Sequence, residues 1–316
     1  MERLYGVYAY PIPESITHGI EGCVLNEVSE DPNVYRNYPN KEDVNFLVIR
    51  QGIVNDVLKY YPNVKWLQLL NAGFEKVDVE ELKRRNIIFT NARSVYCATI
   101  AEDVIAKILL LARNYMRHFK DQQNCFWPDD NQLPNLNLDL NGRVLGILGA
   151  GAIGHEIAIR ARTFGLIVKG YDPYIKERDG FEVIYSGENG LKELLEESDF
   201  VITSLPVTEE TKDIMNDKTF AMMKPTAYFL NVARGQIVDE TALARALNNH
   251  IIAGASIDVT KREPLPSDDP LWKAENIMIT PHRAAYGDQM INKMCELIER
   301  NIYHYLKDEK MEDRVL

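Results

Sequence analysis

The sequence lacks the features that mark disulfide-linked, cysteine-metal, secreted and membrane-spanning proteins. Its 316 residues include only four cysteines, which are widely spaced and form no C-x-x-C pair. This spacing argues against a disulfide framework and against a cysteine-based metal site. No basic, apolar leader opens the chain, and no apolar run is long enough to span a bilayer. We therefore expect a cytoplasmic protein with reduced thiols, no metal and no membrane partner.

Negative charge outweighs positive charge. Lysine and arginine number 36 against 47 aspartates and glutamates, which gives a formal net charge of −11. This balance argues against a nucleic-acid partner, although it does not bear on a small anionic substrate. The length allows two domains, and 46% hydrophobic with 26% charged residues is typical of a globular protein.

The most informative motif is a glycine cluster in the middle of the chain. A predicted strand at Val144–Leu148 leads into Gly149-Ala150-Gly151-Ala152-Ile153-Gly154, and a predicted helix follows at once. The three glycines suit a tight turn, the approach of the backbone to a pyrophosphate, and close packing of helix on strand. The N–H groups at the start of the helix would face the anion. We expect the dinucleotide to be bound at Gly149, Gly151, Ala152, Ile153 and Gly154.

An aspartate after the next predicted strand indicates which dinucleotide is used. Asp172 follows Gly154 by 18 residues, at the end of the strand Leu166–Tyr171. A carboxylate at this distance accepts hydrogen bonds from the adenine-ribose hydroxyls and repels a 2′-phosphate. NAD is therefore favoured over NADP, although Lys176 and Arg178 are nearby. The alternative is a glycine turn followed by an unrelated aspartate.

Strands and helices alternate on both sides of the glycine cluster, which predicts an α/β protein. We expect two Rossmann-like or flavodoxin-like domains with doubly wound parallel sheets. A long helix is predicted at Thr99–Phe119 and a surface connection at Asp129–Leu140. The last predicted helix, Asp288–Leu306, would return the chain to the first domain. The boundaries are thus 1–97 plus 286–316 for a discontinuous substrate domain and 98–285 for a NAD-binding domain.

Polar residues suited to hydride-transfer chemistry follow three of the later predicted strands. They are Arg234, Asp258 with Glu263, and His282. Ligands of open parallel sheets bind outside the carboxyl ends of the strands. Histidine suits proton transfer near neutral pH, a carboxylate beside it would orient the imidazole, and a guanidinium can hold a substrate carboxylate. Taken singly, each residue also fits a plain structural role.

Several segments in order resemble the D-isomer-specific 2-hydroxyacid dehydrogenase family. The resemblance covers nearly the whole chain, and its three later motifs surround Arg234, Glu263 and His282. The matching segments are Leu140–Gly149, Leu205–Pro206, Lys224–Ala227, Asn231–Glu240, Ile257–Val259, Glu263–Pro266 and Thr280–His282.

The resemblance implies a role for each matching residue. Arg234 would bind the substrate carboxylate and carbonyl, and His282 would be the acid/base with Glu263 as its partner. Asp258 would contact the nicotinamide side of NAD. Further cofactor contacts are implied at Pro206, Ala233 and Thr99. Substrate contacts are implied at Ala72, Gly73, Tyr96 and Trp127, although Tyr96 and Trp127 also fit simple packing.

We expect a NAD-dependent oxidoreductase that interconverts a small 2-keto acid and its (R)-2-hydroxy acid, and a homodimer. Within the family, a glyoxylate or hydroxypyruvate reductase and a phosphoglycerate dehydrogenase are alternatives. A NAD-sensing binding protein, like the corepressors of this fold, is an alternative from another class. The chain departs from the usual family pattern at Thr260, Lys261 and Arg262, and at Arg283, where an apolar residue is common.

Overall fold

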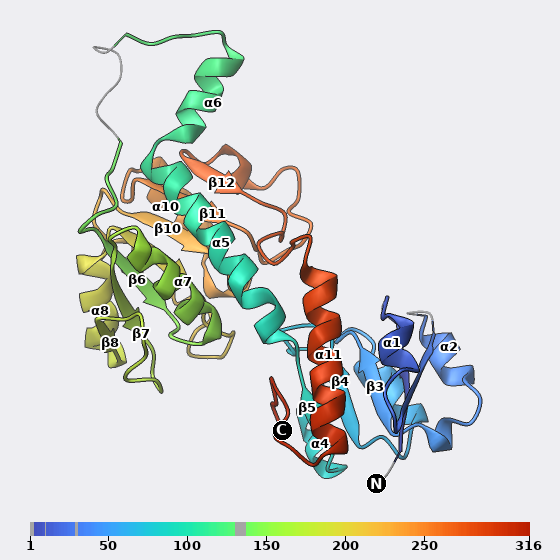
Figure 1. Cartoon of the computed structure of the whole chain (residues 1–316). Coiled ribbons are helices and arrows are strands. Elements are labelled where there is room, and N and C mark those ends of the chain that lie inside the picture. The colour runs from blue at the N-terminus through green and yellow to red at the C-terminus, as the bar shows by residue number, and fades with distance from the viewer. Residues whose placement is uncertain (1–2, 10, 29–30, 130–136) are drawn as a thin grey trace. The chain divides into compact units, whose positions relative to one another are not determined.

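The computed structural model describes residues 3–9, 11–28, 31–129 and 137–316. Most of the predicted connection at Asp129–Leu140 therefore lies outside the described residues. The chain divides into two compact units (Figure 1). Met1–Tyr96 and Gly287–Leu316 form one, which we call the discontinuous unit, and Cys97–Tyr286 forms the other, the central unit.

The discontinuous unit is built on a five-stranded parallel sheet in the order β2-β1-β3-β4-β5. This is the flavodoxin-like order of a doubly wound sheet. Its strands are β1 (Leu4–Tyr8), β2 (Cys23–Glu27), β3 (Phe46–Ile49), β4 (Trp66–Leu69) and β5 (Ile88–Thr90). Its helices are α1 (Glu14–Thr17), α2 (Pro32–Asn37), η1 (Lys41–Asp43), α3 (Val54–Val57), η2 (Leu58–Tyr60), α4 (Val79–Arg84) and α11 (Met290–Leu306).

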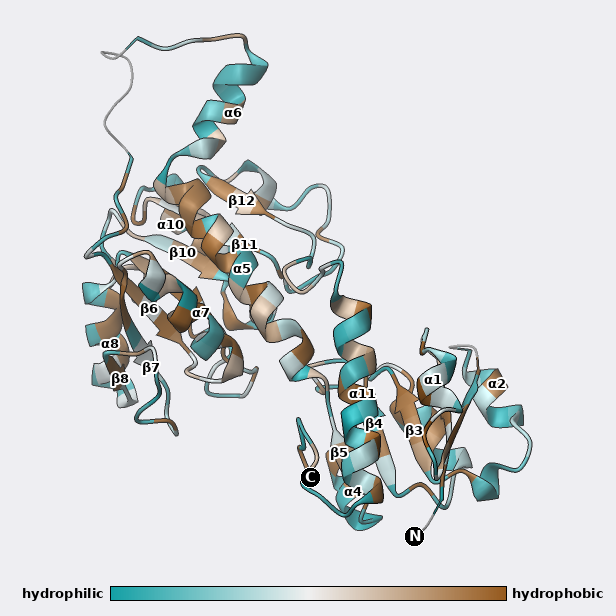
Figure 2. Cartoon of the chain, viewed as in Figure 1, coloured by the Kyte–Doolittle hydropathy of each residue, from teal (hydrophilic) through white to brown (hydrophobic). Residues whose placement is uncertain are grey.

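The alternation of side chains along these strands divides the core of this unit into two clusters. Phe46 and Val48 of β3 pack in the cluster that contains Met294 and Ile298 of α11. The alternate β3 residues Leu47 and Ile49 belong to the other cluster, with residues of α2, α3 and α4. Figure 2 shows the hydrophobic character of β3 between the more polar helices. The C-terminal helix thus supplies part of the core of the N-terminal sheet.

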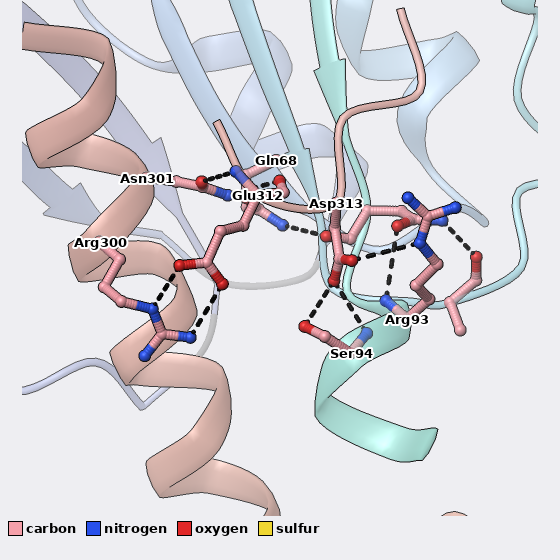
Figure 3. A network of polar contacts seen from close by, with 9 residues as sticks. Gln68, Arg93, Ser94, Arg300, Asn301, Glu312 and Asp313 are labelled. Atoms are coloured by element: carbon pink, nitrogen blue, oxygen red, sulfur yellow. Dashed lines mark hydrogen bonds and ion pairs between the residues drawn. The ribbon is translucent and has the colours of Figure 1, made fainter. Parts of the chain in front are cut away.

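The C-terminal tail adds a short antiparallel segment to the edge of this sheet. Val315 N donates to Phe89 O at 2.7 Å, and Arg314 pairs with Thr90. The Asp313 carboxylate accepts hydrogen bonds from Ser94 N at 2.8 Å and Ser94 Oγ at 2.6 Å (Figure 3). Asp313 therefore caps the first turn of α5 (Arg93–Ala112) from a distant part of the sequence.

The central unit contains a seven-stranded parallel sheet in the order β12-β11-β10-β9-β6-β7-β8. The strand order reverses between β6 and β9, where ligands of this architecture bind. The strands are β6 (Val144–Leu148), β7 (Ile167–Tyr171), β8 (Val183–Tyr185), β9 (Phe200–Thr203), β10 (Tyr228–Asn231), β11 (Gly254–Ile257) and β12 (Ile277–Ile279). The prediction of an α/β protein with two doubly wound parallel sheets and a discontinuous first domain is confirmed.

The helices of the central unit follow its strands in alternation. Besides α5 they are α6 (Tyr115–Gln123), α7 (Ala152–Thr163), α8 (Gly187–Glu197), α9 (Asp217–Phe220), η4 (Gly235–Ile237), α10 (Glu240–Asn248) and η5 (Pro270–Lys273). Residues of α8, α9 and α10 pack with Leu148, Val201 and Phe229 in one core cluster. On β6 the neighbouring residue Ile147 contacts the start of α7 instead, so α7 and α8 lie on opposite faces.

The predicted helix at Thr99–Phe119 is wrong at its start and in its continuity. Helix α5 begins six residues earlier, at Arg93, and ends at Ala112. Asn114 has φ 54°, in the left-handed region, and separates α5 from α6. A helix cannot continue through this conformation, which asparagine tolerates better than most residues.

Candidate active site

The three glycines of the turn differ in what a side chain would meet at each position. Gly149 has φ 105°, and a Cβ there would lie 2.9 Å from the backbone of Ser204 in the loop after β9. A Cβ at Gly154 would lie 2.1 Å from Gly149 O. At Gly151, by contrast, a Cβ would enter open space. Two glycines therefore allow close packing of the protein itself, whereas the third leaves room for a group outside it.

The open space beside Gly151 fits a dinucleotide phosphate. Gly151 is the N-cap of the 12-residue helix α7, and Ala152 and Ile153 occupy its first turn half-buried. N–H groups in the first turn have no intrahelical acceptor, and the helix dipole favours an anion there. The residues present thus fit a bound pyrophosphate.

Asp172 follows β7 and is tied to the glycine turn. Its Oδ2 accepts a hydrogen bond from Ala150 N at 3.0 Å, and its Oδ1 accepts from Tyr174 N and Ile175 N at 2.9 Å. Arg178 donates to Ala150 O at 3.0 Å. The carboxylate therefore fixes the turn as well as standing at the position expected of a ribose ligand.

Arg234 lies in the loop after β10, which a buried amide holds in place. Asn231 Oδ1 accepts from Ala233 N at 3.0 Å, and Asn231 Nδ2 donates to Arg234 O at 3.0 Å. The next residue, Gly235, passes so close to the loop after β11 that a Cβ would lie 2.0 Å from the carbonyl carbon of Thr260. This contact brings the loop of Arg234 beside the loop of Glu263, and sequence reasoning missed it.

His282 and Glu263 form a direct pair. His282 Nδ1 lies 2.8 Å from Glu263 Oε2, and Glu263 Oε1 accepts from Thr260 N at 3.2 Å. Both side chains are partly exposed, at 47% for His282 and 40% for Glu263. The carboxylate fixes the ring through Nδ1, and Nε2 remains for a substrate oxygen.

His282 itself has φ 54°, in the left-handed region. Its N–H donates to Asp258 O at 2.8 Å, and Arg283 N and Ala284 N each donate to the Asp258 carboxylate at 2.9 Å. Asp258 is buried and also accepts from Thr280 Oγ1. The structure thus shows Asp258 holding the backbone around His282, a role that the sequence did not indicate. Its expected contact with nicotinamide stays a prediction.

Burial alone would raise the pKa of Asp258, but these contacts outweigh it. Hydrogen bonds from Thr280, Ala284 and Arg283, together with the charge of Lys107, hold its pKa below the usual value. Lys107 of α5 is buried, which the sequence analysis also missed. A signal was available, because a lysine three residues after Val104 lies on the apolar face of the predicted helix.

In the discontinuous unit, neutral side chains hold the loop after β4. Asn91 Nδ2 donates to Ala72 O at 2.7 Å, and Ala92 N donates to Asn71 O at 3.1 Å. The Tyr96 hydroxyl donates to Leu70 O at 2.6 Å, which favours a packing role for this ring. Ala72 and Gly73 are half-buried within this fixed backbone.

The remaining predicted site residues are placed as follows. Pro206 is exposed after β9, Ala233 is buried after β10, and Thr99 is half-buried on α5. Trp127 follows α6 and is 92% exposed, so nothing within the described chain covers it.

The described residues also bear on two other kinds of site. They contain no group of three or more histidine, cysteine, aspartate or glutamate side chains that could hold a metal ion. Over the same ranges, no helix combines the length and apolar character that crossing a bilayer requires.

The fold and this edge of the sheet define a dinucleotide-binding α/β protein, and comparisons with known proteins identify its family. The model of the D-isomer specific 2-hydroxyacid dehydrogenase NAD-binding domain matches residues 105–284. A glyoxylate reductase of Thermofilum pendens is 32% identical over 94% of this chain and 90% of its own length. A glyoxylate reductase of Korarchaeum cryptofilum is 35% identical over 80% of this chain and 76% of its own.

A solved structure agrees over the full length. A D-isomer specific 2-hydroxyacid dehydrogenase family protein from Aeromonas salmonicida has a TM-score of 0.83 and 26% identity, covering 100% of this chain and 99% of that one. The chain belongs to the D-isomer specific 2-hydroxyacid dehydrogenase family. It is an oxidoreductase that acts on the CH–OH group of a hydroxy acid.

Proposed function

We propose that this protein uses NAD to interconvert a small 2-keto acid and its (R)-2-hydroxy acid, with His282 as the acid/base. The observation that carries the proposal is the 2.8 Å contact between His282 Nδ1 and Glu263 Oε2. It lies at the carboxyl edge of the same sheet as the glycine turn. The names of the relatives support glyoxylate as one substrate of this class.

The chain's own residues have distinct parts in this reaction. The start of α7 would hold the pyrophosphate, and the bound nicotinamide cofactor would supply or accept the hydride. Arg234 would bind the substrate carboxylate with two donors. In the discontinuous unit, the backbone N–H groups of Ala72 and Gly73 are suited to an anionic group. His282 would give a proton from Nε2 to the substrate oxygen during reduction and take it back during oxidation.

The choice of NAD over NADP rests on Asp172. Its carboxylate is held beside the glycine turn by three backbone N–H groups. A 2′-phosphate would meet this negative charge, whereas two ribose hydroxyls could donate to it.

We also infer a homodimer formed through the central unit. Four large aromatic side chains of α6 and the segment after it are exposed within one chain, and a second copy would cover them. They are Tyr115, Phe119, Phe126 and Trp127.

Steady-state kinetics test the proposed reaction directly. The wild type and the His282→Ala variant are assayed with NADH and NADPH against glyoxylate, pyruvate, hydroxypyruvate and larger 2-keto acids. We expect His282→Ala to lower kcat by about 10²- to 10⁴-fold, and NADH to exceed NADPH in kcat/KM by more than about tenfold because of charge repulsion. Full activity of the variant would overturn the mechanism. Cofactor binding without turnover of any keto acid would favour a NAD-sensing role.

A further inference from the structure

Helix α5 carries a lysine in a position that normally suits an apolar residue. Lys107 lies on the same helix face as Ile100, Val104 and Leu111, all of which are buried. The Lys107 side chain is only 4% exposed. Burying an ammonium group is strongly unfavourable unless other groups pair with it and accept its hydrogen bonds.

Three groups surround this ammonium. Lys107 Nζ lies 2.6 Å from Asp103 Oδ2, one turn earlier on α5, and 3.6 Å from Asp258 Oδ1 at the end of β11. It also donates to Thr280 Oγ1 at 2.9 Å. The Thr280 hydroxyl in turn donates to Asp258 Oδ1. Lys107 therefore reaches Asp258 both by charge and through a hydroxyl that is itself hydrogen-bonded.

The Asp258 carboxylate is the link between this buried cluster and the proposed acid/base. Oδ1 accepts from Arg283 N and Oδ2 accepts from Ala284 N, the two N–H groups that follow His282. The His282 backbone has φ 54°, an unfavourable conformation for a residue with a side chain. Hydrogen bonds from the N–H groups of His282, Arg283 and Ala284 to Asp258 keep the backbone in this conformation.

The two carboxylates of the cluster differ in their acidity. Burial raises the pKa of Asp103, although Lys107 opposes this. For Asp258 burial acts in the same direction, but its hydrogen bonds and Lys107 lower the pKa overall. Asp258 is accordingly the carboxylate that the cluster favours in its ionised form.

We propose that Lys107 is a positioning residue for the reaction: by pairing with Asp258 and Thr280 it orients the Asp258 carboxylate, which holds the backbone that presents His282. Lys107 itself does not touch substrate or cofactor in this proposal. The inference rests on the acid/base role proposed for His282.

A double-mutant cycle in kcat tests whether Lys107 acts through Asp258. The variants are Lys107→Met, Asp258→Asn and the two together, assayed with NADH and the best 2-keto acid. We expect Lys107→Met to lower kcat by about 10- to 100-fold, the effect of a small displacement of a reacting group, with the KM for NADH nearly unchanged. In the Asp258→Asn background the same substitution should change kcat by no more than about twofold. Equal effects in both backgrounds would overturn the proposal.

A second comparison separates positioning from simple charge balance. Lys107→Met leaves Asp103 without its cation, so the variant Asp103→Asn/Lys107→Met removes both charges. We expect its kcat to stay within about twofold of that of Lys107→Met, because Asp258 still lacks its partner. Recovery of wild-type kcat would show that Lys107 only neutralises Asp103 and would overturn the proposal. If Lys107→Met does not fold, Asp103→Asn/Lys107→Met takes its place in the cycle. Effects on kcat that are additive with those of Asp258→Asn would then overturn the proposal.

The matched control is Lys192→Met. Lys192 also pairs with a carboxylate one helical turn away, Glu196 at 3.7 Å, but its side chain is 56% exposed. We expect wild-type kcat for this variant. His282→Ala distinguishes the two levels of failure: if it keeps its activity, the proposed function fails, whereas if it alone loses activity, only the role of Lys107 fails.

Discussion

The candidate site loops of the two units differ in the side chains that they carry. At the carboxyl edge of the central sheet the loops carry ionic groups: Asp172, Arg234, Glu263 and His282. The loop after β4 in the discontinuous unit, by contrast, is held by neutral groups that bond to its backbone. These are the amide of Asn91, which donates to Ala72 O, and the hydroxyl of Tyr96, which donates to Leu70 O.

We propose that the ionic groups of the central unit react, whereas the neutral groups of the discontinuous unit only position the backbone. His282 and Glu263 are partly exposed, and their contact uses only Nδ1 of the His282 ring. Gln68 and Asn91 are buried, and both ends of the Gln68 amide are engaged: Nε2 donates to Leu69 O and Asn91 O, and Oε1 accepts from Thr90 and Asn301. Substitutions in the central unit should therefore lower kcat, and those in the discontinuous unit should alter KM or stability.

After His282→Ala, the largest effect is expected for Glu263→Gln. The amide can keep a hydrogen bond to His282 Nδ1 but not the negative charge that stabilises a protonated ring. We expect kcat for keto-acid reduction to fall by about 100-fold, within the usual range for acid–base catalysis. The KM values should change little, which steady-state kinetics with NADH will measure.

Glu275→Gln is the matched control for this substitution. Glu275 also faces a histidine, His250, at 3.8 Å, but both side chains are mostly exposed. Its kcat should equal that of the wild type. If Glu263→Gln lowers kcat no more than Glu275→Gln does, the His282–Glu263 pair behaves like an ordinary surface pair and the proposed contrast fails.

The sequence was most informative about the central unit, for a physical reason. Strands β9 and β10 are buried on both faces, so they stand out as apolar runs between polar segments. The candidate catalytic residues lie in the loops that follow the strand ends, where the rule for parallel sheets places ligands. The pairing of His282 with Glu263 was predicted in this way. The pairing of Lys107 with Asp258 was not, because no local pattern links α5 to the end of β11.

The discontinuous unit was harder to predict because its contacts are less local. Strand β2 lies at the sheet edge and includes the polar residues Asn26 and Glu27, so its apolar signal is weak and it was missed. The start of α5 was misplaced because its capping group, Asp313, comes from the other end of the chain. The amide network around Gln68 likewise joins β4, β5 and α11, and neutral amides carry no recognisable motif.

An intermediate effect is expected for Tyr96→Phe. The change keeps the ring but removes the 2.6 Å hydrogen bond to Leu70 O, which precedes the loop of Ala72 and Gly73. Losing one such bond corresponds to a change of about fivefold. We expect the KM for the keto acid to rise by about that factor, with kcat unchanged.

Tyr60→Phe serves as the control, because its hydroxyl accepts an exposed hydrogen bond from Arg36. It should leave KM as in the wild type. A fall in kcat at constant KM for Tyr96→Phe would instead place Tyr96 in the chemical step, and the contrast between the two units would fail.

The smallest effect is expected for Asp313→Ala, which removes the distant cap of α5. The first turn of the helix would lose an acceptor for Ser94 N, and such losses cost about 1 kcal/mol. Trp66 reports on this unit, because it is buried in its core while Trp272 and Trp127 are exposed. We expect urea unfolding followed by tryptophan fluorescence to show this loss, with kcat and KM unchanged.

Glu309→Ala, an exposed carboxylate on the same tail, is the control and should not alter stability. Substitution of Asp313 and of Asp258 therefore compares the two units directly. Asp313 accepts hydrogen bonds from the backbone N–H and the side-chain hydroxyl of Ser94, and Asp258 accepts from the two backbone N–H groups that follow His282. Only Asp258 holds a segment that ends in a reactive group, so only its loss should reach kcat. A fall in kcat for Asp313→Ala would show that positioning in the discontinuous unit also controls the chemical step.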